Sequence, residues 1–189
     1  MLILKPGLLA TFQDLGRRGF GRFGVNPGGV IDTAAARIAN ALCGNSDSEP
    51  VLEMNFPAPE IKFTSDCVFV LSGADLDARL NGSPIVSGRL RSASVGDVVS
   101  FAGRRSGAIA YLAVRGGFLL EDWLGSLGTN LAAGMGGFHG RAVRKGDQVE
   151  FGEDHSAAPR LIASHTLFPF YTPFPTVRFV RGPEHEIMT

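Results

Sequence analysis

Residues 13–44 read QDLGRRGFGRFGVNPGGVIDTAAARIANALCG, and this stretch changes character half-way along. Its first part, residues 13–29, contains six glycines, three arginines and an Asn-Pro-Gly-Gly turn. Such a composition leaves the backbone free to turn sharply and favours neither a helix nor a strand. In the second part apolar residues recur at helical spacing between Asp32, a suitable N-cap, and Gly44, a suitable C-terminal cap. The stretch predicts a glycine-rich loop that leads into a single helix over residues 33–43.

Outside this helix, apolar and polar residues alternate with a period of two, which is typical of strands with one buried face. The runs cover residues 2–4, 61–63, 68–71, 76–80, 98–101, 108–114 and 148–151. The dipeptide Asn81-Gly82 is a strong signal for a tight hairpin turn, because it tolerates positive φ at both central positions. The sequence therefore predicts a mainly β protein, with a second helical turn near residues 119–124.

Two stretches of the sequence are similar to each other. VGDVVSF at residues 95–101 and KGDQVEF at residues 145–151 each place a Gly-Asp pair before an alternating run. Pairs of this kind close corners in β-barrels and sandwiches. We expect both stretches to form the same turn into a strand.

Composition narrows the class of protein. Eighteen basic and eighteen acidic side chains leave no net charge to attract nucleic acid or a membrane surface. The apolar runs are strand-sized, far shorter than the ~20 residues of a membrane span. Cys43 and Cys67 stand alone, without a metal-ligand spacing, so we expect reduced core cysteines, no metal site and a cytoplasmic location.

The common catalytic motifs are missing or lack their context. Gly19, Gly21 and Gly24 satisfy G-x-G-x-x-G, but no strand–turn–helix pattern surrounds them. Neither a phosphate-binding P-loop nor the G-x-S-x-G motif of serine hydrolases occurs. No segment resembles the biotin attachment sequence, so we expect no covalent biotin on this chain.

Glycine clusters beside arginines are the remaining candidates for chemistry. The clusters at residues 16–29, 115–117 and 134–140 are accompanied by Arg17, Arg115 and Arg141. Backbone N–H groups and guanidinium groups together suit a carboxylate, a phosphoryl group or a developing oxyanion. The same glycines would equally permit tight corners in a β-barrel. Ser72 and Asp75 follow an apolar run, where they suit either a ligand or a structural turn. Ser126 and Thr129 lie on a loop broken by glycines, where their hydroxyls suit either a ligand or backbone groups.

Several segments, taken in order, resemble the allophanate hydrolase subunit 2 family of biotin-dependent carboxyltransferase-like proteins. They are LKPGLLATFQDLGRRGFGRFGVNPGGVID, RIANALCGN, VLEMNFPAPEIKF, LSGADLDARLNG, AYLAVRGGF, LGSLGTN and GMGGFHGRAVRKGD. The resemblance implies a cyclophilin-like β-barrel that is the first of two related halves. Residues 1–165 would form the barrel half. Residues 166–189 would be a linker rich in proline and aromatic residues, ending in the first strand, at residues 177–180, of a missing or truncated second half.

The family includes the C-type subunit of ATP-dependent 5-oxoprolinase, Kip-type regulators and the carboxyltransferase of urea carboxylase. The resemblance therefore implies a component that hydrolyses 5-oxoproline to glutamate together with two partners, a Kip-inhibitor-like B-type subunit and a lactam-hydrolysing A-type subunit. ATP with magnesium would act at the level of that complex. The alternatives are a carboxyltransferase of the urea carboxylase and allophanate pathway, and a non-catalytic regulatory module that binds a kinase inhibitor protein.

The resemblance also implies site residues. Asp14 and Asp75 are the candidate catalytic bases. The candidates for binding substrate or phosphate are Gln13, Arg17, Asp32, Ser72, Arg115, Gly117, Ser126, Thr129, Gly136, Gly137 and Arg141. Where relatives tend to read Gly-Ser-Arg-Ser-Thr, residues 125–129 here read Gly-Ser-Leu-Gly-Thr, so one arginine and one hydroxyl of the family pattern are absent.

Overall fold

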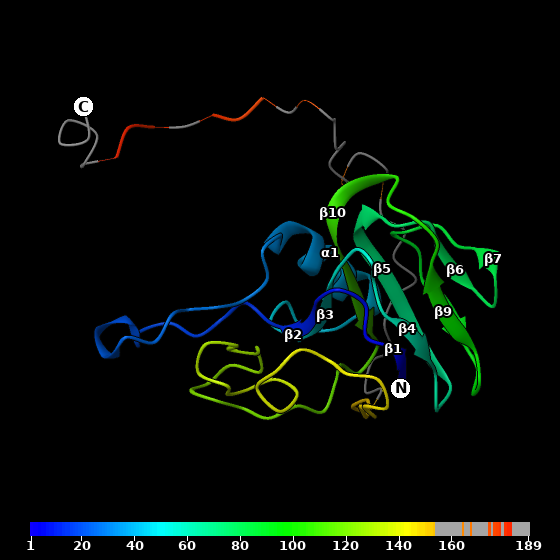
Figure 1. Cartoon of the computed structure of the whole chain (residues 1–189), viewed down its shortest axis with the longest axis horizontal. Helices are drawn as coiled ribbons and strands as arrows, with labels where there is room; N and C mark the ends of the chain where they lie inside the picture. The colour runs from blue at the N-terminus through cyan, green and yellow to red at the C-terminus, as the bar shows by residue number, and fades with distance from the viewer. Residues whose placement is uncertain (154–163, 165–166, 168–173, 175, 179, 183–189) are drawn as a thin grey trace.

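Two antiparallel sheets and one helix make up the body of the computed structural model (Figure 1), which describes residues 1–153, 164, 167, 174, 176–178 and 180–182. The first sheet has the order β1 (Leu2–Lys5), β4 (Glu60–Lys62), β9 (Val98–Phe101), β6 (Ala78–Leu80) and β7 (Ser83–Pro84). The second has the order β2 (Ala10–Gln13), β3 (Val51–Asn55), β10 (Ser106–Val114), β5 (Cys67–Asp75) and β8 (Arg91–Ala93). The predicted fold class, mainly β with one short helix, is confirmed.

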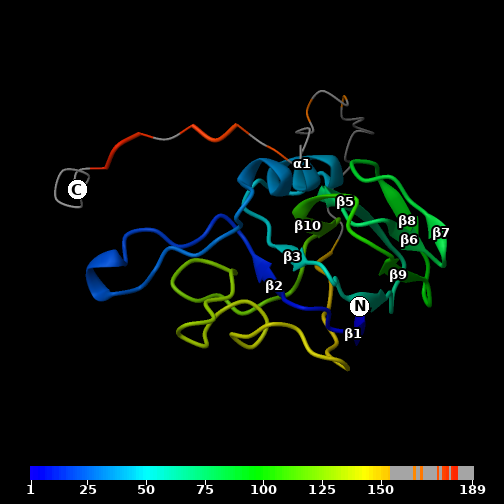
Figure 2. The same cartoon turned by 45° about the horizontal axis from the view of Figure 1, so that its top comes forward.

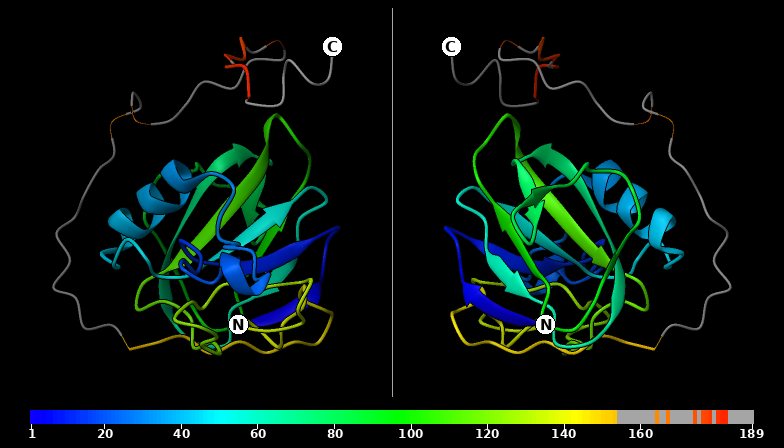
Figure 3. Two further views of the ribbon diagram at one scale, coloured as in Figure 1. Left: turned by 90° about the vertical axis from the view of Figure 1, so that its left-hand side faces the viewer. Right: turned by 90° about the vertical axis from the view of Figure 1, so that its right-hand side faces the viewer.

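The main hydrophobic core lies between the two sheets. Ile3, Ile61 and Val99 of the first sheet and Leu52 and Leu112 of the second belong to one buried cluster. Because side chains alternate along a strand, the residues next to Leu52 and Leu112 point to the other face of the second sheet. There they pack against helix α1 (Thr33–Cys43), which covers the outer face of that sheet (Figures 2 and 3).

Helix α1 begins and ends where the sequence predicts. The carboxylate of Asp32 accepts a hydrogen bond from the backbone N–H of Ala35 at 2.9 Å, and Gly44 adopts the left-handed conformation that ends the helix. Small residues on one face, Ala35 and Ala39 among them, allow the helix to approach the sheet closely. Among the described residues, no helix is both long and apolar enough to cross a membrane.

The predicted turns are also confirmed. Asn81 and Gly82 both have positive φ and join β6 to β7 in a two-residue hairpin. In the two Gly-Asp turns, the N–H of Gly96 donates to Phe63 and the N–H of Gly146 donates to Ile3, with matching bonds back from Phe63 and Ile3. The two stretches therefore form the same turn in the first sheet. The turn at Gly96 lies beside the end of β4, and the turn at Gly146 lies beside β1.

The predicted closed barrel is not found in the part of the chain that the structure describes. β1 and β2 are edge strands of different sheets, and so are β7 and β8. On one side the irregular segment 143–149 spans the gap, since Val143 bonds to Ala10 of β2 and Val149 bonds to Met1 beside β1. Short edge strands and this irregular segment replace the continuous ladder that closure requires.

Some local predictions were wrong or incomplete. Residues 119–124 form no helical turn, because their backbone groups bond to residues 126, 137 and 150 instead. The strand predicted at 148–151 is reduced to single bridges at Gln148 and Phe151. β2, β3 and β8 were not predicted. The expected linker at 166–189 and its strand at 177–180 fall largely outside the described residues, so the proposed domain boundary stays a prediction.

Candidate functional site

Three segments far apart in the sequence meet beside β2, and we call residues 13–17, 123–130 and 136–137 the loop junction (Figures 1 and 2). Thr129 docks on the strand, because its N–H donates to the carbonyl of Phe12 at 2.9 Å. The side-chain amide of Gln13 donates to the carbonyl of Thr129 at 3.1 Å. Seven of the predicted site residues lie in this junction: Gln13, Asp14, Arg17, Ser126, Thr129, Gly136 and Gly137.

Asp14 orders the junction through its carboxylate. One oxygen accepts hydrogen bonds from the hydroxyl of Ser126 and the N–H of Gly16, both at 2.8 Å. The other oxygen accepts from the N–H of Leu127 at 2.7 Å. Asp14 is buried, so these three donors compensate the charge that burial removes from water. The carboxylate thereby ties the turn after β2 to the loop at 126–127.

Arg17 is the most deeply buried charged residue of the junction, with 2% of its surface exposed. Its guanidinium donates to the carbonyls of Gly128 and Trp123 and to the hydroxyl of Ser126, and it stacks over the Trp123 ring at 4.7 Å. Burial lowers the pKa of this guanidinium, while the nearby charge of Asp14 acts in the opposite direction. Its planar fork suits this set of acceptors, which a lysine would not match.

Two glycines allow the third segment to close over the junction. A side-chain carbon at Gly137 would overlap the hydroxyl of Thr129, and one at Gly136 would lie 2.7 Å from the carbonyl oxygen of Gly128. Both glycines also have positive φ, which other residues rarely adopt. Only glycine permits this approach.

The junction retains polar atoms without partners among the described residues. They are Oε1 of Gln13, Nη1 of Arg17 and Oγ1 of Thr129, all buried. An unsatisfied buried polar group costs about 1–3 kcal/mol. Such groups normally bind an ordered water molecule or a ligand. One acceptor, one cationic donor and one hydroxyl therefore remain available at this place.

The glycine-rich segment itself projects away from the sheets and returns to α1 (Figures 1 and 2). Within it, residues 18–28 include no buried residue. Arg18 and Arg22, unlike Arg17, form no hydrogen bond or ion pair with the described residues, although Arg22 stacks on the exposed ring of Phe23 at 4.7 Å. Two unpaired positive charges therefore lie on this segment.

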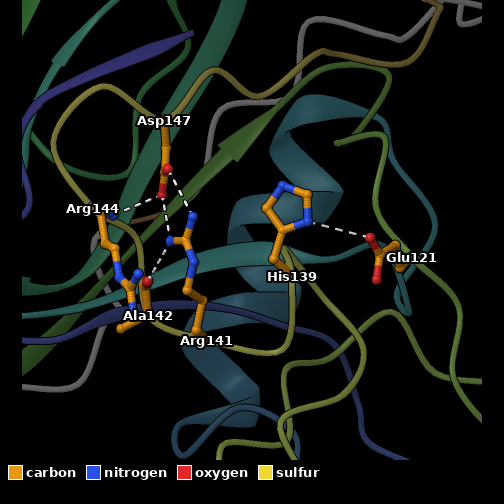
Figure 4. A network of polar contacts seen from close by, with 6 residues as sticks. All are labelled: Glu121, His139, Arg141, Ala142, Arg144 and Asp147. Carbon is orange, nitrogen blue, oxygen red and sulfur yellow. Dashed lines mark hydrogen bonds and ion pairs between the residues drawn. The ribbon is translucent and has the colours of Figure 1, made fainter.

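The other predicted arginines lie apart from the junction, each with partners in the chain. The guanidinium of Arg115 donates to the carbonyl of Cys43 at 3.0 Å, at the C-terminal end of α1. Arg141 faces Asp147, while His139, two residues earlier, faces Glu121 at 3.4 Å (Figure 4). The structure does not bring Arg17, Arg115 and Arg141 to one shared anion site.

The remaining predicted residues have structural contacts. Asp32 caps α1, and the buried hydroxyl of Ser72 donates to the carbonyl of Ala35 in the same helix at 2.7 Å. Asp75, at the end of β5, accepts a hydrogen bond from the N–H of Asp77 at 3.0 Å. Gly117 packs directly against the carboxylate of Glu49. Their roles in binding or catalysis stay predictions.

A buried pair beneath the N-terminus of α1 was not predicted from the sequence. The hydroxyl of Tyr111 donates to Glu53 at 3.0 Å and accepts from the N–H of Asp32 at 2.8 Å, while Glu53 also accepts from the N–H of Ile31 at 2.8 Å. Burial raises the pKa of the Glu53 carboxyl, and it also raises the pKa of the Tyr111 hydroxyl. The one signal in the sequence is a single acidic residue within the apolar run VLEMN.

Among the described residues, no three His, Cys, Asp or Glu side chains are arranged to hold a metal ion.

Comparison with known proteins relates the chain to carboxyltransferase domains. The carboxyltransferase domain, subdomain A and B, matches residues 23–189. The C subunit of the 5-oxoprolinase of Haemophilus influenzae is 36% identical over 153 residues, which cover 81% of this chain and 50% of that protein. The urea amidolyase of Lachancea kluyveri is 33% identical, over 90% of this chain and 9% of its own.

Solved structures agree with these matches. The crystal structure of the K. lactis urea amidolyase superimposes with a TM-score of 0.83 at 31% identity, over 90% of this chain and 11% of that chain. The chain spans about half the length of the 5-oxoprolinase relatives that it matches.

Proposed function

The chain belongs to the carboxyltransferase domain family, subdomain A and B, and we propose that it is the C-type component of an ATP-dependent 5-oxoprolinase. Such an enzyme hydrolyses the lactam 5-oxoproline to glutamate. The observation that carries the proposal is the identity with the C subunit of a 5-oxoprolinase over four fifths of this chain. The relatives are parts of enzyme assemblies, so the chain would work together with the A-type and B-type subunits.

The free polar atoms of the loop junction support a lactam as the ligand. A lactam offers an N–H donor and a carbonyl acceptor, and 5-oxoproline adds a carboxylate. Oε1 of Gln13 would accept from the lactam N–H, while Nη1 of Arg17 and the hydroxyl of Thr129 would donate to its oxygens. All three atoms are buried, so in this proposal the loop junction opens when the ligand enters.

The junction also limits which residue acts as a base. Both carboxylate oxygens of Asp14 already accept hydrogen bonds from this chain. We therefore propose that Asp14 positions the loop that carries Ser126 and Thr129. Its predicted role as the base, like that of Asp75, stays a prediction.

The predicted arginines do not fit the phosphates of ATP. The guanidiniums of Arg17 and Arg141 are held by acceptors of the chain, and that of Arg115 binds the end of α1. A phosphate would have to displace these contacts, since Nη1 of Arg17 is the one atom of these donors that is buried without a partner among the described residues. We therefore propose that ATP binds to another member of the complex, and we assign no step of its chemistry to this chain.

A second candidate is the carboxyltransferase of a urea carboxylase. The close superposition on the K. lactis urea amidolyase favours it. In that case the free atoms of the junction would face a ureido group, which also offers N–H donors and a carbonyl.

One reconstitution separates these functions. The full chain is mixed with the A-type and B-type partners of 5-oxoprolinase, ATP and 5-oxoproline, and ADP and glutamate are measured. A parallel reaction supplies a carboxylated biotin carrier and urea. Formation of ADP and glutamate only when the chain is present supports the 5-oxoprolinase component, whereas carboxyl transfer to urea supports the second candidate.

Two further results would overturn the first proposal. If the A-type and B-type partners turn over equally well without the chain, it is not a required component. If the chain binds the B-type partner tightly but neither reaction proceeds, it acts as a regulatory module that binds a kinase inhibitor protein.

A further inference from the structure

We propose that a cavity next to the loop junction binds small organic cations, with Glu49 as the anionic anchor. The cavity has a volume of about 510 Å³. This falls within the range of about 300–1,000 Å³ that is usual for small-molecule sites. It lies between residues 116–121 and 137–139, with Leu127 of the junction in its wall. Glu49 is not among the site residues that the sequence predicts.

The backbone of Glu49 is held in place from the helix side. Its N–H donates to the carbonyl of Ser46 at 3.1 Å, and its carbonyl accepts from the side-chain amide of Asn40, a residue of α1, at 2.8 Å. A side chain at position 117 would overlap the Glu49 carboxyl, so Gly117 leaves the room that the carboxyl occupies. The position of the carboxyl at the cavity is therefore built into the fold.

Within the described part of the chain, no positively charged side chain forms an ion pair with this carboxyl. The described residues form no hydrogen bond or ion pair with its oxygens, and partial burial raises its pKa. The other titratable residues that line the cavity are Glu121 and His139, which pair with each other at 3.4 Å. Arg141 pairs with Asp147 (Figure 4), and its guanidinium lies 5.6 Å from the ring of Phe138, on which it stacks. The cavity thus carries an excess of negative charge.

The walls suit the apolar part of such a ligand. Phe118 and Phe138 line the cavity together with leucine side chains. Aromatic faces attract cations, most strongly where water is excluded. An ammonium group beside Glu49 would relieve the cost of the half-buried charge, while its apolar body packs against Phe138 and the exposed Leu119.

The test compares two probes of nearly equal shape. Binding of phenethylammonium chloride and of uncharged 2-phenylethanol to the full chain is measured by titration calorimetry at pH 7.5. We expect the cation to bind at least ~10-fold more tightly than the alcohol. Glu49→Gln removes the charge and keeps the shape, so this variant should lose the preference. Glu150→Gln, which removes an exposed carboxylate outside the cavity, should keep it.

The pH dependence gives a second readout that needs no variant. The ammonium stays charged at acid pH, whereas Glu49 becomes neutral as the pH falls through its raised pKa. The preference for the cation should therefore disappear on acidification. Equal binding of the two probes by the wild-type chain, or an undiminished preference in Glu49→Gln, would overturn the proposal.

Discussion

Arg141 and Asp147 form a bidentate ion pair, with Nη1 2.7 Å from Oδ2 and Nη2 2.9 Å from Oδ1 (Figure 4). The pair lowers the pKa of the Asp147 carboxyl and raises the pKa of the Arg141 guanidinium. Asp147 also accepts from the N–H of Arg144 at 2.7 Å. Arg141 therefore stabilises the turn that brings segment 143–149 to the edge of β1.

Asp147→Asn should destabilise the protein in a pH-dependent way. At pH 7 we expect a loss of about 1–2 kcal/mol in the free energy of unfolding, because a charge-assisted pair is removed. The carboxyl titrates lower in the folded state than its unfolded value of about 3.9. Its contribution is thus present above about pH 4 and is lost as the pH falls through the folded pKa. Urea unfolding at a series of pH values from 7 to 3 measures this.

Asp47→Asn is the matched control for that variant. Asp47 lies 3.5 Å from Arg37, but the two side chains are 66% and 52% exposed. An ion pair so well solvated should contribute no more than about 0.5 kcal/mol at any pH. Equal losses in the two variants would show that Arg141 and Asp147 gain nothing from their partly buried geometry.

Arg17→Ala should disorganise the loop junction. It removes a buried guanidinium from the carbonyls of Gly128 and Trp123 and from Ser126. We expect a loss of about 3 kcal/mol or more, since buried acceptors are left without donors. Thermal unfolding and the fluorescence of Trp123, the only tryptophan, report the change.

The neighbouring exposed residue supplies the control. Arg18→Ala should change stability by less than about 0.5 kcal/mol. Similar effects of the two substitutions would contradict the buried role of Arg17.

Gly137→Ala should cost more than the same change at Gly134. Both glycines have positive φ, and that backbone term alone costs about 1–2 kcal/mol for alanine. A methyl group at position 134 would meet open space, whereas one at 137 would overlap Thr129. We expect Gly137→Ala to be at least about 2 kcal/mol the more destabilising of the two, because of overpacking. Urea unfolding of both variants tests this, and equal losses would exclude the close approach.

Tyr111→Phe should weaken the attachment of α1 to the sheet. The phenol bridges Glu53 and the N–H of Asp32, so its removal should cost about 1–3 kcal/mol. The hydrogen bond from Tyr111 lowers the pKa of Glu53, so that pKa should rise further in the variant. Carbon-13 NMR of the Glu53 carboxyl across a pH titration measures the shift. An unchanged titration would mean that the phenol does not stabilise the carboxylate.

Local structure was readable from the sequence where the signals act over a few residues. Asp32 and Gly44 mark the ends of α1, Asn81-Gly82 forms its hairpin, and the two Gly-Asp turns match each other. The helix caps and the hairpin depend on residues at most five apart or on a backbone angle of the residue itself. Each Gly-Asp turn likewise has a local bond, from Asp97 to Ser94 and from Asp147 to Arg144. The alternation of apolar and polar residues supplied the mainly β class, and the resemblance to known sequences supplied the family.

The partners of the charged residues could not be predicted from the sequence. From the sequence, Arg17, Arg115 and Arg141 were equal candidates for an anion site, but Arg17 binds loop residues more than a hundred positions away and Arg141 binds Asp147. Glu53 and Tyr111, 58 residues apart, became a pair only through the register of β3 and β10.

The sequence by itself thus determined the helix, the turns and most strands, because backbone propensity and capping are local. The tertiary structure alone decided which polar atoms are satisfied and which remain free at Gln13, Arg17, Thr129 and Glu49. The reason is physical: a long side chain can bond to any acceptor that the fold brings within reach, and strand order and loop closure choose that acceptor.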